Sequence, residues 1–177
     1  MRARSAVFGL SLLLATSASG QGLMADMHTD VGAAEKKFLD LARAIPESVY
    51  AWRPPGARSI GEVLLHVASD NYFLVIPMGK AAPAATNITS DFKSLEPYEK
   101  RQLSKDQIIA ELADSFKHLH DAMNLNTEAN LKENIKFFGQ DWSRQRVMLA
   151  TVTHMHEHLG QLIAYARSNN VAPPWSR

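Results

Sequence analysis

Apolar residues recur at helical spacing in four separate segments, and this periodicity constrains the fold more than any other feature of the chain. In the first segment they step by three and four residues through Met27, Val31, Ala34, Phe38, Leu41 and Ile45. The other segments cover residues 59–79, 104–123 and, from 141 or 143, up to 168. An amphipathic helix has to bury its apolar stripe against a neighbour. Four such helices predict an all-α fold, a four-helix bundle.

Signals for helix ends support these segments. Ser59 is followed three residues later by Glu62, and Ser104 by Gln107. Each pair forms a capping box, in which the two side chains satisfy backbone N–H groups at the start of a helix. Pro46 ends the first helix, because proline lacks the N–H group that would continue the hydrogen-bond ladder.

The segments between the helices are rich in residues that interrupt regular structure. Residues 81–103 contain two prolines and many small side chains, which predicts a connection. Residues 124–141 are polar and predict a loop with a short turn or strand. Residues 171–175 contain two adjacent prolines, and we expect this end of the chain to pack across the bundle.

The first twenty residues have the order of a secretory signal peptide. Arg2 and Arg4 precede the apolar run 6–15, and small residues follow it. The run is shorter than the roughly 20 residues needed to span a bilayer, so we expect cleavage near Gly20 and no stable membrane anchor afterwards. The sequence therefore predicts a signal peptide at 1–20, a single domain at 21–177, and export to the periplasm or the medium.

Charge and cysteine content exclude several classes of function. The formal net charge is +1, and loss of Arg2 and Arg4 with the signal peptide would make it −1. Such a chain has no basic stripe for nucleic acid, so we expect a small molecule as the partner. Since the chain has no cysteine, it has no disulfide, no thiolate nucleophile and no cysteine metal ligand.

Two histidines of the fourth segment have the spacing of a shared metal site. His154 and His158 are four residues apart, so on a helix their rings stack on one face, about one turn apart. They fall on the stripe that otherwise carries Val147, Thr151, Leu162 and Tyr165. A shared metal would satisfy both imidazoles, and so would separate hydrogen bonds to hydroxyl or carbonyl groups.

His66 is the candidate third ligand, because it lies in an apolar stretch of the second helix. Three imidazoles with water in the remaining positions would form the first shell of a catalytic metal ion. They suit Zn, Ni or Fe better than Mg or Ca. Asp70, one turn beyond His66, and Gln161, three residues after His158, are candidates to orient ligands or water around that ion.

Other residues of the same segments fit a site less well. Residues 154–158 match the H-x-x-E-H protease motif with Glu157 as the base, but no acidic residue follows His158 to supply the further ligand that such proteases use. The remaining histidines are predicted to lie on the surface, and Asn71, Tyr72 and Tyr165 are predicted to line a pocket. The surface group comprises His28, His118, His120 and His156.

The two histidine segments resemble signatures of the DinB/YfiT-like superfamily. One is Trp-Arg-Pro at 52–54 followed by 59–68 with His66, and the other is His154-x-x-x-His158-x-Gly-Gln-Leu. The closing segment 167–174 is also similar to the ends of many members, so the resemblance covers essentially the whole mature chain. It implies an up-down-down-up four-helix bundle that holds a divalent metal on His66, His154 and His158, often as a homodimer. Characterised relatives include thiol-dependent transferases and isomerases, and many members have no known activity.

Two functional hypotheses follow from the sequence. The first is an exported, DinB-like, metal-dependent enzyme, a hydrolase or transferase of unknown substrate. The second is a non-enzymatic helical bundle that binds a metal or another ligand. Coordination separates them, because an open position beside the three histidines favours an enzyme and a closed fourth protein ligand favours a structural role.

Overall fold

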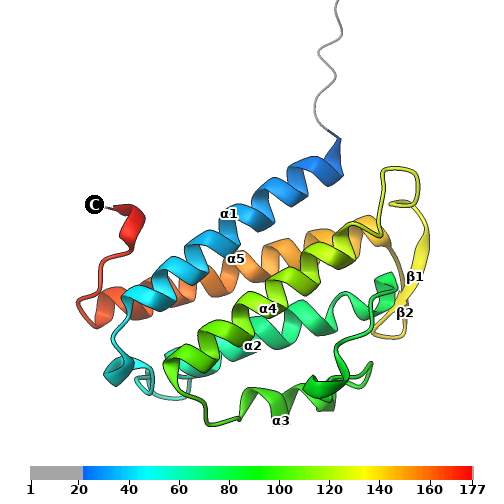
Figure 1. Ribbon diagram of the computed structural model, residues 1–177. Coiled ribbons are helices and arrows are strands. Elements are labelled where there is room, and N and C mark those ends of the chain that lie inside the picture. The colour runs from blue at the N-terminus through cyan, green and yellow to red at the C-terminus, as the bar shows by residue number, and fades with distance from the viewer. Residues whose placement is uncertain (1–21, 177) are drawn as a thin grey trace, which may run out of the picture.

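Four long helices form the body of the protein (Figure 1). In the computed structural model, which describes residues 22–176, they are α1 (Leu23–Ala44), α2 (Ile60–Phe73), α4 (Lys105–Met123) and α5 (Arg144–Ser168). α1 and α2 each contact both α4 and α5, so the four helices surround one core. The predicted all-α bundle is confirmed. The predicted signal peptide, 1–20, lies outside the described residues.

The direction of the helices is also as predicted. In Figure 1, α1 and α5 run one way through the bundle, and α2 and α4 run the opposite way. This is the up-down-down-up order. Because α2 and α4 are parallel, the chain between them has to return along the length of the bundle, which requires a long connection.

That connection is more structured than the sequence predicts. It contains the short helix α3 (Leu95–Glu99), which packs against α2, and the 3₁₀ turns η2 (Ile76–Met78), η3 (Ala84–Thr86) and η4 (Phe92–Ser94). The predicted connection at 81–103 therefore contains one short helix, α3, that the sequence pattern did not indicate. The second helix also ends earlier than predicted, at Phe73, since the chain turns into η2 before Gly79.

A small β-hairpin joins α4 to α5. Its strands β1 (Asn134–Phe137) and β2 (Gln140–Ser143) are antiparallel, with Phe137 opposite Gln140. The polar segment was predicted to contain a short turn or strand, and this prediction is confirmed. The two turn residues, Phe138 and Gly139, both have positive φ, at 47° and 74°. The hairpin stands at the end of the bundle where α2 ends and α5 begins (Figure 1).

Helix ends and core follow the sequence pattern. Both capping boxes are present: the side chains of Ser59 and Ser104 accept from the N–H groups of Glu62 and Gln107. At α5 the side chain of Ser143 accepts from the N–H group of Arg146 and so caps the start of that helix. The apolar stripe of the first segment is fully buried from Met27 to Ile45. Short turns η1 (Glu47–Val49) and η5 (Pro174–Ser176) complete the chain, and η5 contacts α1, as predicted for the end segment. Within 22–176, no helix has both the length and the apolarity needed to cross a bilayer.

Candidate metal centre

The structure brings the three candidate histidines together. His66 comes from α2, and His154 and His158 come from consecutive turns of α5. Ring centroids lie 4.6 Å apart for His66 and His158, and 4.5 Å apart for His154 and His158. Asp70 joins them, so that one donor atom from each of the four residues lies within 4.8 Å of every other. Four donors this close can hold one ion. We call these four residues the His/Asp cluster.

Hydrogen bonds orient two of the imidazoles. His66 Nδ1 lies 2.8 Å from Glu99 Oε1, and His158 Nδ1 lies 2.8 Å from Gln161 Oε1. A carboxylate and an amide oxygen only accept, so each Nδ1 carries a hydrogen and donates it. Gln161 itself donates through Nε2 to the hydroxyl of Tyr165 at 2.8 Å. In the neutral form of a ring that donates through Nδ1, the Nε2 lone pair is free to act as a metal ligand.

Those Nε2 atoms face the cluster. His66 Nε2 lies 3.1 Å from Asp70 Oδ2, and His158 Nε2 lies 3.1 Å from His154 Nε2. His154 Nδ1 is 3.4 Å from the same Asp70 oxygen. Asp70 was predicted to orient ligands around the ion, but it lies among the donor atoms. Gln161 lies behind His158, one of the candidate ligands.

The two imidazoles of α5 are ready to bind a cation. Burial, and then the neighbouring His158 and His66, lower the pKa of His154 to about 4. Burial also lowers the pKa of His158, against the opposing effect of its hydrogen bond to Gln161. Both rings are neutral at pH 7, the form in which imidazole is a ligand. They are half-buried rather than fully buried, so the predicted inward stripe is open to solvent at these two positions.

Asp70 shows how well a cation suits this donor set. Its side chain is buried, and burial raises its pKa to about 7, although nearby His66 acts in the opposite direction. Ionisation of a buried carboxyl costs a large amount of free energy unless a positive charge lies beside it. A divalent ion among three imidazoles and this carboxylate supplies that charge, so the residues present fit the metal that the sequence predicts.

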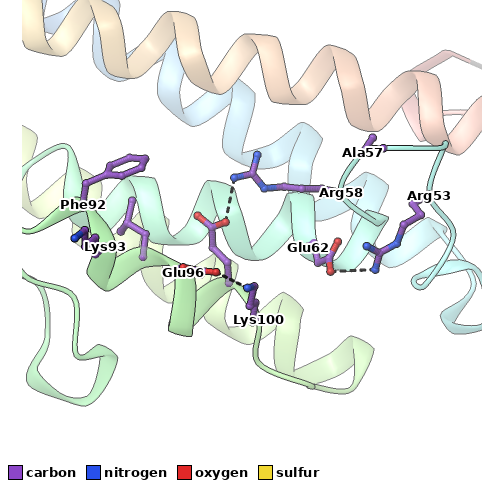
Figure 2. A pocket seen from close by; sticks show the side chains of 11 residues that line it. Arg53, Ala57, Arg58, Glu62, Phe92, Lys93, Glu96 and Lys100 are labelled. Atoms are coloured by element: carbon purple, nitrogen blue, oxygen red, sulfur yellow. Dashed lines mark hydrogen bonds and ion pairs between the residues drawn. The ribbon is translucent and has the colours of Figure 1, made fainter.

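Glu99 lies between the His/Asp cluster and the guanidinium group of Arg58. It accepts from His66, from the hydroxyl of Ser69 at 3.0 Å, and from Arg58 Nη2 at 3.1 Å. Burial opposes ionisation of Glu99, yet the hydrogen bond from His66 and the charge of Arg58 hold its pKa below the usual range. Figure 2 shows Arg58 from the side of a neighbouring cavity of about 540 Å³, which Glu96 and Lys100 also line. Glu99 is thus a carboxylate that fixes the orientation of His66.

Sequence reasoning missed Glu99. It follows His66 by 33 residues and lies on α3, in the segment predicted to be a connection. Helical spacing relates residues of one helix, and it cannot relate α2 to a short helix that folds back on it. In the sequence, Glu99 stands out only as one of two acidic residues, with Glu96, on either side of Tyr98. Such pairs of acidic residues are too common to indicate a site.

We expect Glu99→Gln to weaken metal binding by about 10–100-fold, the range observed when a partner behind a ligand is changed. The amide oxygen can still accept from His66, but it lacks the charge that makes the imidazole more basic. Competition titration with a chromogenic chelator measures the change. The matched control is Glu96→Gln on the same helix, whose carboxylate pairs with the exposed Lys100. Equal affinities of the two variants would remove Glu99 from the site.

A pocket of about 360 Å³ opens beside the cluster. His66, Asp70 and His154 form one part of its wall, with Thr153 and Glu157 next to them on α5. The rest of the lining is apolar, and five aromatic side chains contribute to it: Phe73, Phe92, Phe137, Phe138 and Trp142. Glu157 is exposed at this pocket and is not one of the four cluster residues. A small molecule in the pocket would lie next to the candidate metal ligands.

Three residues predicted to line a pocket have other surroundings. Asn71 is buried and donates to Ser115 at 3.0 Å. Tyr72 packs on Tyr98 and lines a different cavity, together with residues of the connection and of α4. Tyr165 supports Gln161 from behind the cluster.

The histidines predicted to lie on the surface differ among themselves. His156 is exposed, while His28 and His120 are half-buried. His118 is 7% exposed, so its prediction is wrong. The reason is that its ring packs against Tyr72 of α2, with centroids 5.1 Å apart. None of these four belongs to the His/Asp cluster of the described residues.

Comparison with known proteins gives a consistent family. The model of the DinB superfamily matches residues 31–162. The fold is similar to that of a DinB-like protein from Bacillus cereus ATCC 10987, at 15% sequence identity and a TM-score of 0.67, over 84% of this chain and 93% of that one. A conserved protein from Enterococcus faecalis (14% identity, TM-score 0.67, 84% and 97% covered) is also similar. A DinB-like protein from Bacillus subtilis is similar as well, at 16% sequence identity and a TM-score of 0.62, over 82% of this chain and 92% of that one. No curated protein matches the sequence.

Proposed function

The chain belongs to the DinB superfamily, whose model covers residues 31–162, and on this premise we propose that it is an exported metal-dependent enzyme, a hydrolase or transferase. His66, His154 and His158, together with Asp70, would hold a divalent transition metal. A bound metal of this kind acts as a Lewis acid and lowers the pKa of a coordinated water. Imidazole and carboxylate donors favour Zn, Ni or Fe for this position.

The observation that carries the proposal is the convergence of the four donors beside a pocket, whose wall includes His66, Asp70 and His154. The side chain of Asp70 is only 8% exposed, whereas that of His154 is 33% exposed and lines the pocket. A small molecule can therefore approach the ligand side of the cluster without displacing core residues. Glu99 and Gln161 hold their imidazoles by hydrogen bonds, so the donors are fixed before a ligand arrives.

One observation favours the second candidate, a bundle that binds metal without catalysis. Three imidazoles and one carboxylate are enough to complete a tetrahedral site, and a closed tetrahedral site is typical of structural zinc. The inclusion of Asp70 in the cluster thus supports a structural role. The two candidates differ in whether the metal keeps a position that a small ligand can take.

Cobalt substitution tests this difference. We expect Co²⁺ to bind as a single ion per chain, with visible absorption bands that change when azide or cyanide is added. That change would mean an exchangeable position, which an enzyme needs. Bands that do not respond to either anion would support the structural alternative, and a protein that binds neither Co²⁺ nor Zn²⁺ would overturn both.

Export and self-association remain parts of the proposal. The signal-like pattern of residues 1–20 supports export, and recovery of mature protein beginning near Gln21 from a non-cytoplasmic fraction would test it. The family resemblance supports a homodimer, which sedimentation measures directly. We expect no nucleic acid partner, because the charge of the chain is close to neutral.

A further inference from the structure

Five aromatic rings gather beside the His/Asp cluster from three separate segments: the end of α2, η4 and the hairpin. Phe73 ends α2, Phe92 begins η4, Phe137 and Phe138 belong to the hairpin, and Trp142 lies on β2. Their centroids are 4.4–6.2 Å apart in a continuous series from Phe92 to Trp142. Rings at such distances pack against one another. Together they form one aromatic wall of the 360 Å³ pocket.

Two of these rings are unusually open to solvent. Phe92 is 60% exposed and Phe138 is 61% exposed, and both line the 360 Å³ pocket. Single exposed apolar side chains are ordinary, but a group of them around a concave site is typical of a binding surface. Three of the cluster residues, His66, Asp70 and His154, line the same pocket. The apolar and polar parts thus face one cavity.

The backbone at Phe138 supports a role for its ring. Its φ is 47°, a left-handed conformation that glycine or asparagine adopts readily and a bulky residue rarely does. Two-residue hairpin turns with positive φ at both positions favour Asn-Gly, and here the pair is Phe-Gly. A strained backbone conformation persists only where the surrounding structure holds it in place. Such conformations are frequent at active sites and ligand-binding sites.

We propose that the pocket binds a small molecule that joins an aromatic or similarly compact apolar group to a polar head able to ligate a metal. The apolar group lies against Phe92, Phe138 and Trp142, and the head reaches the His/Asp cluster. This inference rests on the proposed function, because the head needs the metal. It adds the substrate class, which neither the family nor the cluster specifies.

The size of the pocket agrees with such a ligand. An apolar cavity of about 150 Å³ is enough to hold benzene. At about 360 Å³, the pocket has room for a substituted ring together with a head of several atoms. Only Glu157 adds a full charge beyond the cluster among the lining residues, so little in the pocket favours a highly charged ligand.

Two hydroxamates that differ only in their apolar group test the proposal. With Zn²⁺-loaded protein, we expect benzohydroxamate to bind at least about tenfold more tightly than acetohydroxamate, since the phenyl ring buries its surface in the pocket. In Phe92→Ala and in Phe138→Asn we expect this preference to fall to about threefold or less. Asparagine suits the turn, so the second variant should fold. Leu149→Ala is the matched control, because Leu149 is an exposed apolar residue of α5 outside the pocket.

Zn²⁺ affinity is measured for every protein before the hydroxamates are added, so that two failures are distinguished. A wild-type protein that binds no Zn²⁺ overturns the proposed function and this inference with it. A protein that binds Zn²⁺ but shows no phenyl preference, or the same preference in all variants, overturns this inference alone. It is also overturned if Phe92→Ala and Phe138→Asn convert a dimer to a monomer without changing the preference, because the rings would then form a subunit interface.

Discussion

Phe116→Ala is expected to lower the free energy of unfolding by about 3–5 kcal/mol, the range for removing a fully buried aromatic ring. Phe116 lies at the centre of α4 with an exposed fraction of 0%, and its ring packs on Phe38 of α1 with centroids 5.9 Å apart. Truncation removes this contact and leaves a cavity between two of the four helices. The surrounding side chains can collapse into it only in part, because interiors are closely packed.

Urea unfolding followed by circular dichroism measures the change. The matched control is Leu125→Ala, an apolar residue that is 53% exposed just after the same helix, for which we expect a change within about 0.5 kcal/mol. Phe116→Leu keeps most of the buried volume and should fall between the two. A loss below about 1 kcal/mol for Phe116→Ala would contradict the burial of this ring between α1 and α4.

The bundle could be predicted because each long helix carries its own evidence. The stripe from Met27 to Ile45 satisfies helical spacing without reference to any other part of the chain, and all of it is buried. Ser59 and Ser104 marked two helix starts to within one residue, since a capping box is a local hydrogen-bond pattern. The helix α3 could not be predicted in this way, because five residues complete little more than one turn and show no period.

The same distinction applies to the site. His154 and His158 share a helix face, so their spacing alone predicts that their rings meet. His66 required the further assumption that α2 lies against α5, which the bundle provides. Asp70 was predicted to orient ligands or water, because a spacing of four from His66 gives the face and not the direction of the side chain, and its carboxylate lies among the potential donor atoms. The contact of Glu99 with His66 depends on the fold of the whole connection, which spacing along one helix does not describe.

The aromatic pocket lies further still from what a sequence can predict. Its rings come from the end of α2, from η4 and from both strands of the hairpin with its turn, segments that no periodicity relates. In the sequence, Phe137 and Phe138 marked only the end of a polar stretch. Phe137 and Phe138 become part of the pocket because the long connection and the hairpin pack at the same end of the bundle, beside the part of α2 that carries His66 and Asp70. The parallel course of α2 and α4, which forces the long connection, is therefore what brings Phe92 and Glu99 to the histidines.

His154→Ala is expected to weaken metal binding by more than about 100-fold, since changing only a partner behind a ligand already costs roughly 10–100-fold. Both ring nitrogens of His154 face cluster residues, Nδ1 toward Asp70 at 3.4 Å and Nε2 toward His158 at 3.1 Å. Its pKa, lowered to about 4 by burial and by His158, means that it needs to lose no proton to bind a cation at pH 7. Removing it leaves two imidazoles and one carboxylate.

Elemental analysis of the purified proteins, together with Zn²⁺ titration, measures this loss. His156→Ala is the matched control, because His156 belongs to the same helix, is exposed, and lies outside the His/Asp cluster. We expect that variant to keep the wild-type metal content. The side chain of His154 is 33% exposed and lies at the pocket, so its removal should leave the helical circular dichroism of the bundle unchanged. Equal metal contents in the wild type and His154→Ala would mean that the cluster is held by its own hydrogen bonds and binds no metal.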